Sequence, residues 1–166
     1  MTITLRLLAA SLMVALGACG GGSSSPTTPT TQPTPVPAVN FAGSWSGTYT
    51  ITACGQTGTF AVGGFCDSFS IGSVWPLRLT LTQSGSSVNG TLSQGSIVTT
   101  VTGTVDSAGR LTLNGTGTTS GFSLQIVGWG SSLSGSLMVG TWGTVWTFPG
   151  WSGYAQVVNS LGTFTR

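Results

Sequence analysis

Short runs in which apolar and polar residues alternate are the feature that most restricts how this chain can fold. Such runs occupy residues 77–82, 111–114 and 122–126. Successive side chains of a strand point to opposite faces, so this alternation is typical of strands with one buried face. No segment repeats its apolar residues convincingly with the helical period. The pattern therefore predicts an all-β fold.

Turn signals separate the alternating runs, at residues 84–87, 106–109 and 128–131. The second is the clearest, because the Asp106 carboxylate can accept hydrogen bonds within its own turn while Gly109 adopts a positive φ. We expect eight to ten strands joined mostly by short loops between residues 40 and 166. This arrangement predicts an up-and-down antiparallel β-barrel, with a β-sandwich as the alternative.

A five-residue pattern, apolar-x-Gly-x-apolar, recurs along the chain, and four copies are centred on Gly47, Gly90, Gly103 and Gly135. In an alternating strand the glycine shares a face with its apolar neighbours. Each copy therefore predicts a gap in the inward row, where the strand bends or a neighbouring strand approaches closely. Strongly coiled strands of this kind favour a small closed barrel.

Charged residues are rare, which excludes several classes of function. The chain has no Lys, Glu or His, and after the first 38 residues only Asp67, Arg78, Asp106, Arg110 and Arg166 are charged. Three scattered arginines do not form the basic stripe of a nucleic-acid-binding protein, so we expect no nucleic-acid partner.

Catalytic groups are equally scarce. A serine nucleophile would lack its ordinary base in a chain without His, Lys or Glu. The remaining candidate is a carboxylate pair made by Asp67 and Asp106. Asp106 is expected in a tight turn and Asp67 follows Cys66 directly. We therefore expect no enzymatic activity and no catalytic residues.

The N-terminus carries a ten-residue apolar segment, residues 7–16, preceded by Arg6. It is too short to span a bilayer and is typical of a signal peptide. It ends in Leu16-Gly17-Ala18-Cys19, which resembles the lipobox of bacterial lipoproteins. The resemblance implies that residues 1–18 are removed and that acyl chains such as palmitate are attached to Cys19. The alternative is an ordinary secretory signal cut near Ala18, which leaves Cys19 as a free thiol.

The same resemblance implies a location. The protein would be lipid-anchored in the bacterial cell envelope. Gly20 directly after the cysteine resembles the pattern of lipoproteins that cross the periplasm and are sorted to the outer membrane. Residues 19–39 consist mainly of Gly, Ser, Thr and Pro and contain too little apolar surface to form a core. We expect a disordered, extended linker there, followed by one domain at residues 40–166.

Two short segments of the domain resemble the calycin group, the lipocalin-like and avidin-like barrels. They are Gly43-Ser44-Trp45 in the first expected strand and Gly162-Thr163-Phe164-Thr165-Arg166 in the last. The pattern covers most of residues 41–166. The resemblance implies a barrel open at one end that holds a small ligand, but no family ligand contact has a secure match in this chain.

With Cys19 assigned to lipid, Cys54 and Cys66 remain in an oxidising compartment. A disulfide between them is the simplest prediction, and two free thiols are the alternative. The glycine-rich segment between them is expected to be a flexible loop or hairpin. Two thiolates without histidine are too few ligands for a metal site, so we expect no metal and no other cofactor.

Aromatic residues crowd into the last quarter of the domain, and about half of them are expected to fill the core. Residues 142–151 are too aromatic and too punctuated by Gly and Pro for a simple strand, which predicts that part of this segment forms a loop at one mouth of the barrel. There, aromatic rings would cover an apolar ligand. The candidate ligand contacts are Trp146 and Trp151 first, then Trp142 and Tyr154. Arg78 is the candidate partner for an acidic ligand, although its alternation with leucines predicts that it faces solvent.

The leading functional hypothesis is a non-enzymatic lipoprotein whose barrel binds a small hydrophobic or amphipathic ligand. The alternative is a barrel filled by its own side chains, which contacts envelope proteins or the cell wall. An integral outer-membrane barrel is disfavoured, because the polar faces of the expected strands are largely Ser and Thr rather than a continuous apolar band.

Overall fold

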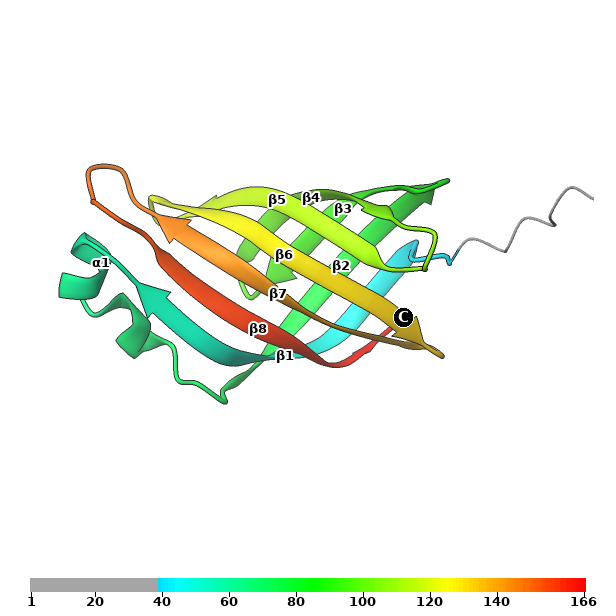
Figure 1. Ribbon diagram of the computed structural model, residues 1–166, viewed down its shortest axis with the longest axis horizontal. Helices are drawn as coiled ribbons and strands as arrows, with labels where there is room; N and C mark the ends of the chain where they lie inside the picture. Colours follow the sequence, from blue (N-terminus) through cyan, green and yellow to red (C-terminus); the bar gives the residue numbers. More distant parts are fainter. Residues whose placement is uncertain (1–38) are drawn as a thin grey trace, which may run out of the picture. The chain divides into compact units, whose positions relative to one another are not determined.

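A computed structural model describes residues 39–166, so the predicted signal peptide, Cys19 and nearly all of the predicted linker lie outside the described residues. Eight strands follow one another around a closed antiparallel barrel (Figure 1). The up-and-down barrel predicted from the sequence is confirmed, at the lower end of the expected strand count. The strands are β1 (Gly43–Gln56), β2 (Val74–Ser84), β3 (Ser87–Gln94), β4 (Ile97–Val105), β5 (Leu111–Thr119), β6 (Phe122–Ser134), β7 (Leu137–Thr147) and β8 (Ala155–Thr165).

The first and last strands close the barrel. β1 pairs with β2 along its first half, for example Gly43 with Leu81, and with β8 along most of its length, ending at Gln56 with Ala155. Within residues 39–166 every strand thus has a neighbouring strand on both sides, which limits the exposed edge that could associate with another chain. No helix in the described residues is long and apolar enough to cross a membrane.

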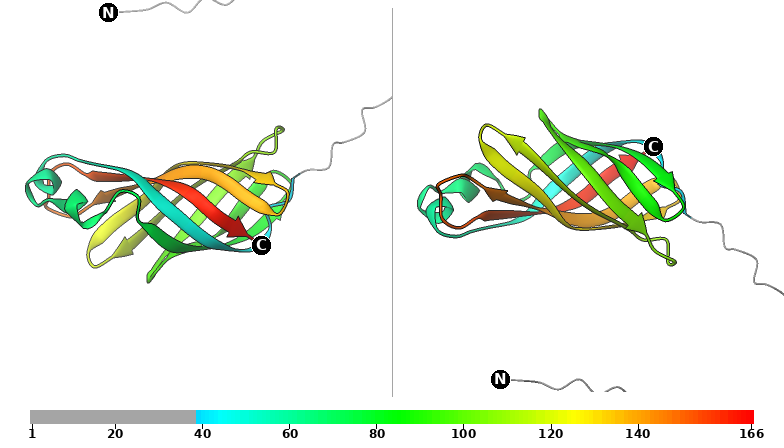
Figure 2. Two further views of the ribbon diagram at one scale, coloured as in Figure 1. Left: turned by 90° about the horizontal axis from the view of Figure 1, so that it is seen from below. Right: turned by 90° about the horizontal axis from the view of Figure 1, so that it is seen from above.

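The two ends of the barrel differ, as the side views show (Figure 2). The terminal end carries residues 39–42, the C-terminal residue Arg166 and the short turns β2–β3, β4–β5 and β6–β7. The opposite, cap end carries two longer connections, residues 57–73 between β1 and β2 and residues 148–154 between β7 and β8. We call these two connections the cap.

The terminal end is closed by the chain itself. Phe41 is fully buried, and its backbone N–H donates to Gln83 Oε1 at 2.7 Å. Trp45 Nε1 donates to the Phe41 carbonyl at 2.8 Å, and the Arg166 guanidinium carbon lies 5.2 Å from the centre of the Trp45 ring. The start of β1 and the end of β8, which carry the calycin resemblance, therefore lie side by side at this end.

Two of the three turn signals are confirmed. Residues 84–87 form the β2–β3 turn, and Asp106 Oδ1 accepts from the N–H groups of Ala108 and Arg110, both at 2.9 Å, in the β4–β5 turn. The prediction for residues 128–131 is wrong, because they lie inside β6. The positive φ of Gly128 accompanies a register shift between Val127 and Gly130, a bulge that bends the strand without reversing it.

Three of the four glycine motifs mark close approaches between strands. A Cβ at Gly47, Gly90 or Gly103 would collide with a backbone carbonyl of the neighbouring strand. The close approach of a neighbouring strand, one of the two predicted alternatives, is therefore found at these three glycines. The fourth prediction is wrong, since Gly135 lies in the β6–β7 turn with a φ of 63°.

Gly103→Ala is expected to lower the free energy of unfolding by about 1–3 kcal/mol, because the new methyl group overlaps the Thr112 carbonyl oxygen. Gly55→Ala in β1 is the matched control, since nothing lies within 4 Å of its Cβ position. Urea unfolding of both variants measures the difference. Equal midpoints would contradict a close approach of β4 and β5 at Gly103.

The half of the barrel next to the terminal end is solidly filled. Inward rows on β2 to β5 are aliphatic, as the alternating runs predict, and Trp129 and Trp142 pack together with ring centres 5.4 Å apart. Apolar side chains that are less than 2% exposed form most of this core. Little space for a ligand is left in this half of the barrel.

The cap contains two short helical turns, α1 (Thr59–Val62) and the 3-10 helix η1 (Phe65–Ser68). The sequence predicted a flexible loop here. The difference has a packing reason: Phe60 is fully buried against aromatic side chains and orders the segment. The predicted disulfide is present, with the Cα atoms of Cys54 and Cys66 5.7 Å apart, and it joins the end of β1 to η1.

Backbone hydrogen bonds join the two parts of the cap. The N–H of Thr57 donates to the Tyr154 carbonyl and the N–H of Thr59 donates to the Ser152 carbonyl, both at 2.9 Å. Figure 2 shows these two segments together at one end of the barrel. The residue 57–73 part of the cap is thus held by the disulfide on one side and by the residue 148–154 part on the other.

Candidate ligand-binding site

A cavity of about 310 Å³ lies in the barrel interior at the cap end. Its side walls are formed by Tyr49 and Ile51 of β1 and Val157 of β8. These residues belong to inward rows of alternating strands, which explains why their side chains meet inside the barrel. The exposed residues Trp75, Gly95 and Ser96 also line the cavity and mark its opening.

Aromatic side chains form the part of the cavity that lies next to the cap. Trp146 is buried, and its Nε1 donates to Thr144 Oγ1 at 3.0 Å, which fixes the orientation of the indole. Phe69 of the cap lies with its ring centre 6.3 Å from that of Trp146, and Phe65 lies 5.2 Å from Phe69. Cys66 lies next to Phe65, so the disulfide holds this aromatic cover in place.

Polar atoms without partners lie deeper in the barrel. Asn159 is 1% exposed, lines the cavity, and has no hydrogen-bond partner at either Oδ1 or Nδ2. Gln94 Oε1, which also belongs to the lining, is buried without a partner. Thr99 Oγ1 and Trp142 Nε1 are two further buried atoms in this state. A buried polar group left unpaired costs about 1–3 kcal/mol, so these atoms are the unusual feature of the interior.

The cavity is uncharged. None of the five charged side chains in the described residues lines it. Burial raises the pKa of the Tyr49 phenol above its ordinary value of 10.0, while the Gln94 side chain acts in the opposite direction. The phenol therefore stays neutral at physiological pH, and the site offers apolar surface and neutral hydrogen-bonding groups.

The structure places one of the predicted contact residues, Trp146, in the lining of the cavity. Trp142 does not line the cavity but is buried next to one of its lining residues, with its ring centre 5.5 Å from that of Tyr49. Trp151 and Tyr154 lie in the cap loop, are 39% and 45% exposed, and do not line the cavity. Arg78 is exposed on the outer face of β2, as its alternation with leucines predicted.

Several cavity residues were missed by the sequence analysis: Tyr49, Phe69, Trp75, Gln94 and Asn159. Two of them carried a usable signal. Trp75 continues the inward row of Leu77 and Leu79 by one step of two residues. Asn159 interrupts the inward row between Val157 and Leu161 with a polar side chain. Phe69 gave no such signal, because the cap brings it over the barrel only in three dimensions.

The carboxylates do not form a pair. Asp67 lies in η1 at the cap end, whereas Asp106 lies in the β4–β5 turn at the terminal end. Residues 39–166 also contain no cluster of three or more His, Cys, Asp or Glu side chains that would hold a metal ion.

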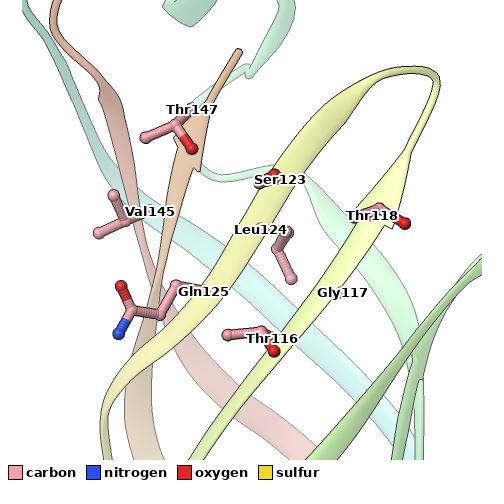
Figure 3. Close-up of a pocket in the computed structure, with 8 residues that line it drawn as sticks. All are labelled: Thr116, Gly117, Thr118, Ser123, Leu124, Gln125, Val145 and Thr147. Atoms are coloured by element: carbon pink, nitrogen blue, oxygen red, sulfur yellow. The ribbon is translucent and has the colours of Figure 1, made fainter. Parts of the chain in front are cut away.

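A larger depression, of about 560 Å³, lies on the outer surface of β5, β6 and β7 (Figure 3). Exposed side chains such as Thr116, Thr118 and Gln125 line it. In Figure 3 the hydroxyl groups of the two threonines point away from the Gln125 amide, so the polar groups do not converge on one point. This depression offers a ligand neither apolar enclosure nor a focused polar contact, and the interior cavity is the better candidate site.

Comparison of the chain with protein-family models, with curated proteins and with solved structures found no match.

Proposed function

We propose that the protein is a non-enzymatic, lipid-anchored lipoprotein of the bacterial cell envelope whose barrel binds a small hydrophobic or amphipathic molecule. The observation that carries the proposal is the cavity at the cap end of a barrel that is otherwise filled. Its volume of about 310 Å³ lies at the lower limit of typical small-molecule pockets. Apolar and aromatic walls with a few polar groups are also typical of such pockets.

The anchoring part of the proposal is supported by the motif Leu16-Gly17-Ala18-Cys19 and by the linker composition that follows it. Two or three acyl chains on Cys19 would give a durable attachment. Gly20 after the cysteine, as in lipoproteins sorted to the outer membrane, supports that membrane as the site of attachment. Val39 lies at the terminal end of the barrel and the cavity opens at the cap end. Attachment through the N-terminus would thus leave the opening free.

The calycin resemblance is proposed as the family relationship. It is supported by the closed eight-strand barrel and by the contact between the two segments that carry the resemblance, with the Trp45 and Phe164 ring centres 6.4 Å apart. A barrel filled at one end and hollow at the other fits the one-ended cup that this resemblance implies.

Binding of N-phenyl-1-naphthylamine, a neutral apolar dye that fluoresces in apolar surroundings, tests the proposal. The chain is secreted behind a cleavable leader without Cys19, so that no detergent is needed. We expect saturable binding to the wild-type protein, and Val157→Trp is expected to weaken it by about tenfold or more, because the new ring occupies the cavity.

Gln156→Trp is the matched control, since it adds the same ring to the neighbouring, outward-facing position of β8. It should bind the dye like the wild type. Thermal unfolding verifies that both variants are folded, and Ile51→Phe replaces Val157→Trp if the latter is not. An absence of saturable binding to wild-type protein would contradict the proposal and favour a filled barrel that contacts envelope proteins.

A further inference from the structure

We propose that the cavity selects ligands that end in a primary carboxamide, and that Asn159 and Gln94 are the residues that recognise this group. The inference rests on the proposed function and specifies the ligand chemistry of the same site. It is drawn from the hydrogen-bonding groups that the cavity leaves unused.

Asn159 is the central observation. It lies on β8 between the inward residues Val157 and Leu161, and its Cα partners on the neighbouring strands are Ile51 of β1 and Trp142 of β7. Ile51 offers no polar side-chain atom, and the Trp142 indole forms no hydrogen bond with the amide, its Nε1 being itself without a partner. An asparagine that is 1% exposed with both amide atoms unpaired is costly unless a partner enters the cavity.

The number of free groups indicates what that partner is. The cavity lining presents two unpaired acceptors, Asn159 Oδ1 and Gln94 Oε1, and one unpaired donor group, Asn159 Nδ2. A primary carboxamide has the complementary set, two N–H donors on nitrogen and one carbonyl acceptor. Its carbonyl and one N–H can pair with the Asn159 amide, which leaves the second N–H for Gln94. Exchanging the oxygen and nitrogen of Asn159 does not change this count.

A carboxylate fits the same groups poorly. It has acceptors only, so it would face the two free oxygens of Asn159 and Gln94 without donating to either. No arginine lines the cavity to neutralise it, and burial of an unpaired charge is strongly unfavourable. A hydrocarbon end would leave all three groups unpaired. The lining therefore discriminates against both, because a site built for hydrogen bonds rejects analogues that lack them.

The apolar walls define the rest of the ligand. Ile51, Val157 and the rings of Tyr49 and Trp146 surround the space between Asn159 and the opening. A ligand with a short alkyl chain or an aromatic ring attached to the carboxamide would place its polar end at Asn159 and its apolar body among these side chains.

Three probes with one skeleton test the inference: 4-phenylbutanamide, 4-phenylbutanoate and butylbenzene. Each is titrated against bound N-phenyl-1-naphthylamine at neutral pH, and its ability to displace the dye is measured. For the wild-type protein we expect the amide to displace the dye at a concentration about tenfold lower than either analogue.

Asn159→Leu is expected to weaken displacement by the amide about tenfold, while butylbenzene binds as well as before or better. Gln94→Met removes one acceptor with little change in size and is expected to weaken the amide about threefold. Gln94→Met also serves as the second variant if Asn159→Leu does not fold. Gln125→Leu is the control, because it removes an exposed amide from the outer face of β6.

The outcomes separate the two proposals. If the wild-type protein does not bind the dye, the proposed function fails. If it binds the dye and the three probes displace it equally, or if Asn159→Leu weakens all three alike, the carboxamide inference is overturned and the carrier function stands. Equal displacement would mean that water satisfies Asn159 whichever ligand is bound.

Discussion

Trp45→Ala is expected to lower the free energy of unfolding by about 3–5 kcal/mol, the largest effect of any single substitution considered for this barrel. Trp45 is 1% exposed and packs on Phe164 with ring centres 6.4 Å apart. It also donates to the Phe41 carbonyl and lies beneath the Arg166 guanidinium. Truncation therefore leaves a cavity, an unpaired carbonyl and a looser chain segment at the terminal end.

Trp75→Ala is the matched control, because Trp75 is 50% exposed at the opposite end and should cost about 1 kcal/mol. Urea unfolding followed by circular dichroism compares the two variants. Trp45→Phe should recover part of the loss, since it retains a ring but neither the indole N–H nor its full volume. Similar losses for Trp45→Ala and Trp75→Ala would contradict the closed terminal end.

Loss of the Cys54–Cys66 disulfide is expected to destabilise the domain by about 3 kcal/mol, since the bridge closes a segment with a sequence separation of 12. For a domain of this size the loss corresponds to a fall in Tm of roughly 10 °C. The residue 57–73 part of the cap would be loosened rather than released, because its hydrogen bonds to residues 148–154 remain. Phe65 and Phe69 would then cover the cavity less firmly, so the bound dye should dissociate faster.

The measurement is thermal unfolding and dye dissociation of the wild type, with and without a phosphine reductant, beside the double variant Cys54→Ser and Cys66→Ser. Reduced wild type and the double variant should behave alike, and the reductant should have no effect on the double variant. A reductant that leaves the wild-type Tm and dissociation rate unchanged, although mass spectrometry shows free thiols, would contradict the role assigned to the bridge.

Local physical rules explain what the sequence predicted correctly about the fold. The alternation at residues 77–82 makes one face of β2 apolar, and that face has to be buried whatever surrounds it. The turn at Asp106 forms from the Asp106 carboxylate and from Gly109 with its φ of 75°, all within five residues. The glycine motif at Gly103 was also readable from the sequence, because only a residue without a Cβ allows the neighbouring strand to approach this closely.

The errors arose where one local signal suits two structures. A glycine with positive φ serves a turn or a bulge equally well, and only the pairing of β6 with β5 and β7 makes Gly128 part of a bulge. Gly135 shows the converse, since its apolar neighbours resemble a strand whereas the chain reverses there. The segment between the two cysteines resembled a loop because the burial of Phe60 depends on rings from distant parts of the chain.

The candidate site depended most on tertiary structure. The sequence by itself determined that this is an all-β domain whose strands bury one face. It also determined that aromatic side chains are plentiful near the end of the domain and that almost no charge is present. These properties follow from residue type and local spacing. Only the tertiary structure decided which side chains share one cavity. Trp146 and Trp151 are the same residue type and only five positions apart. Closure of β8 on β1 nevertheless places Trp146 inside the barrel beside Tyr49 and Asn159, while Trp151 lies in the cap and packs on Phe60. Contacts between residues a hundred positions apart depend on how the barrel closes, and no local pattern encodes them.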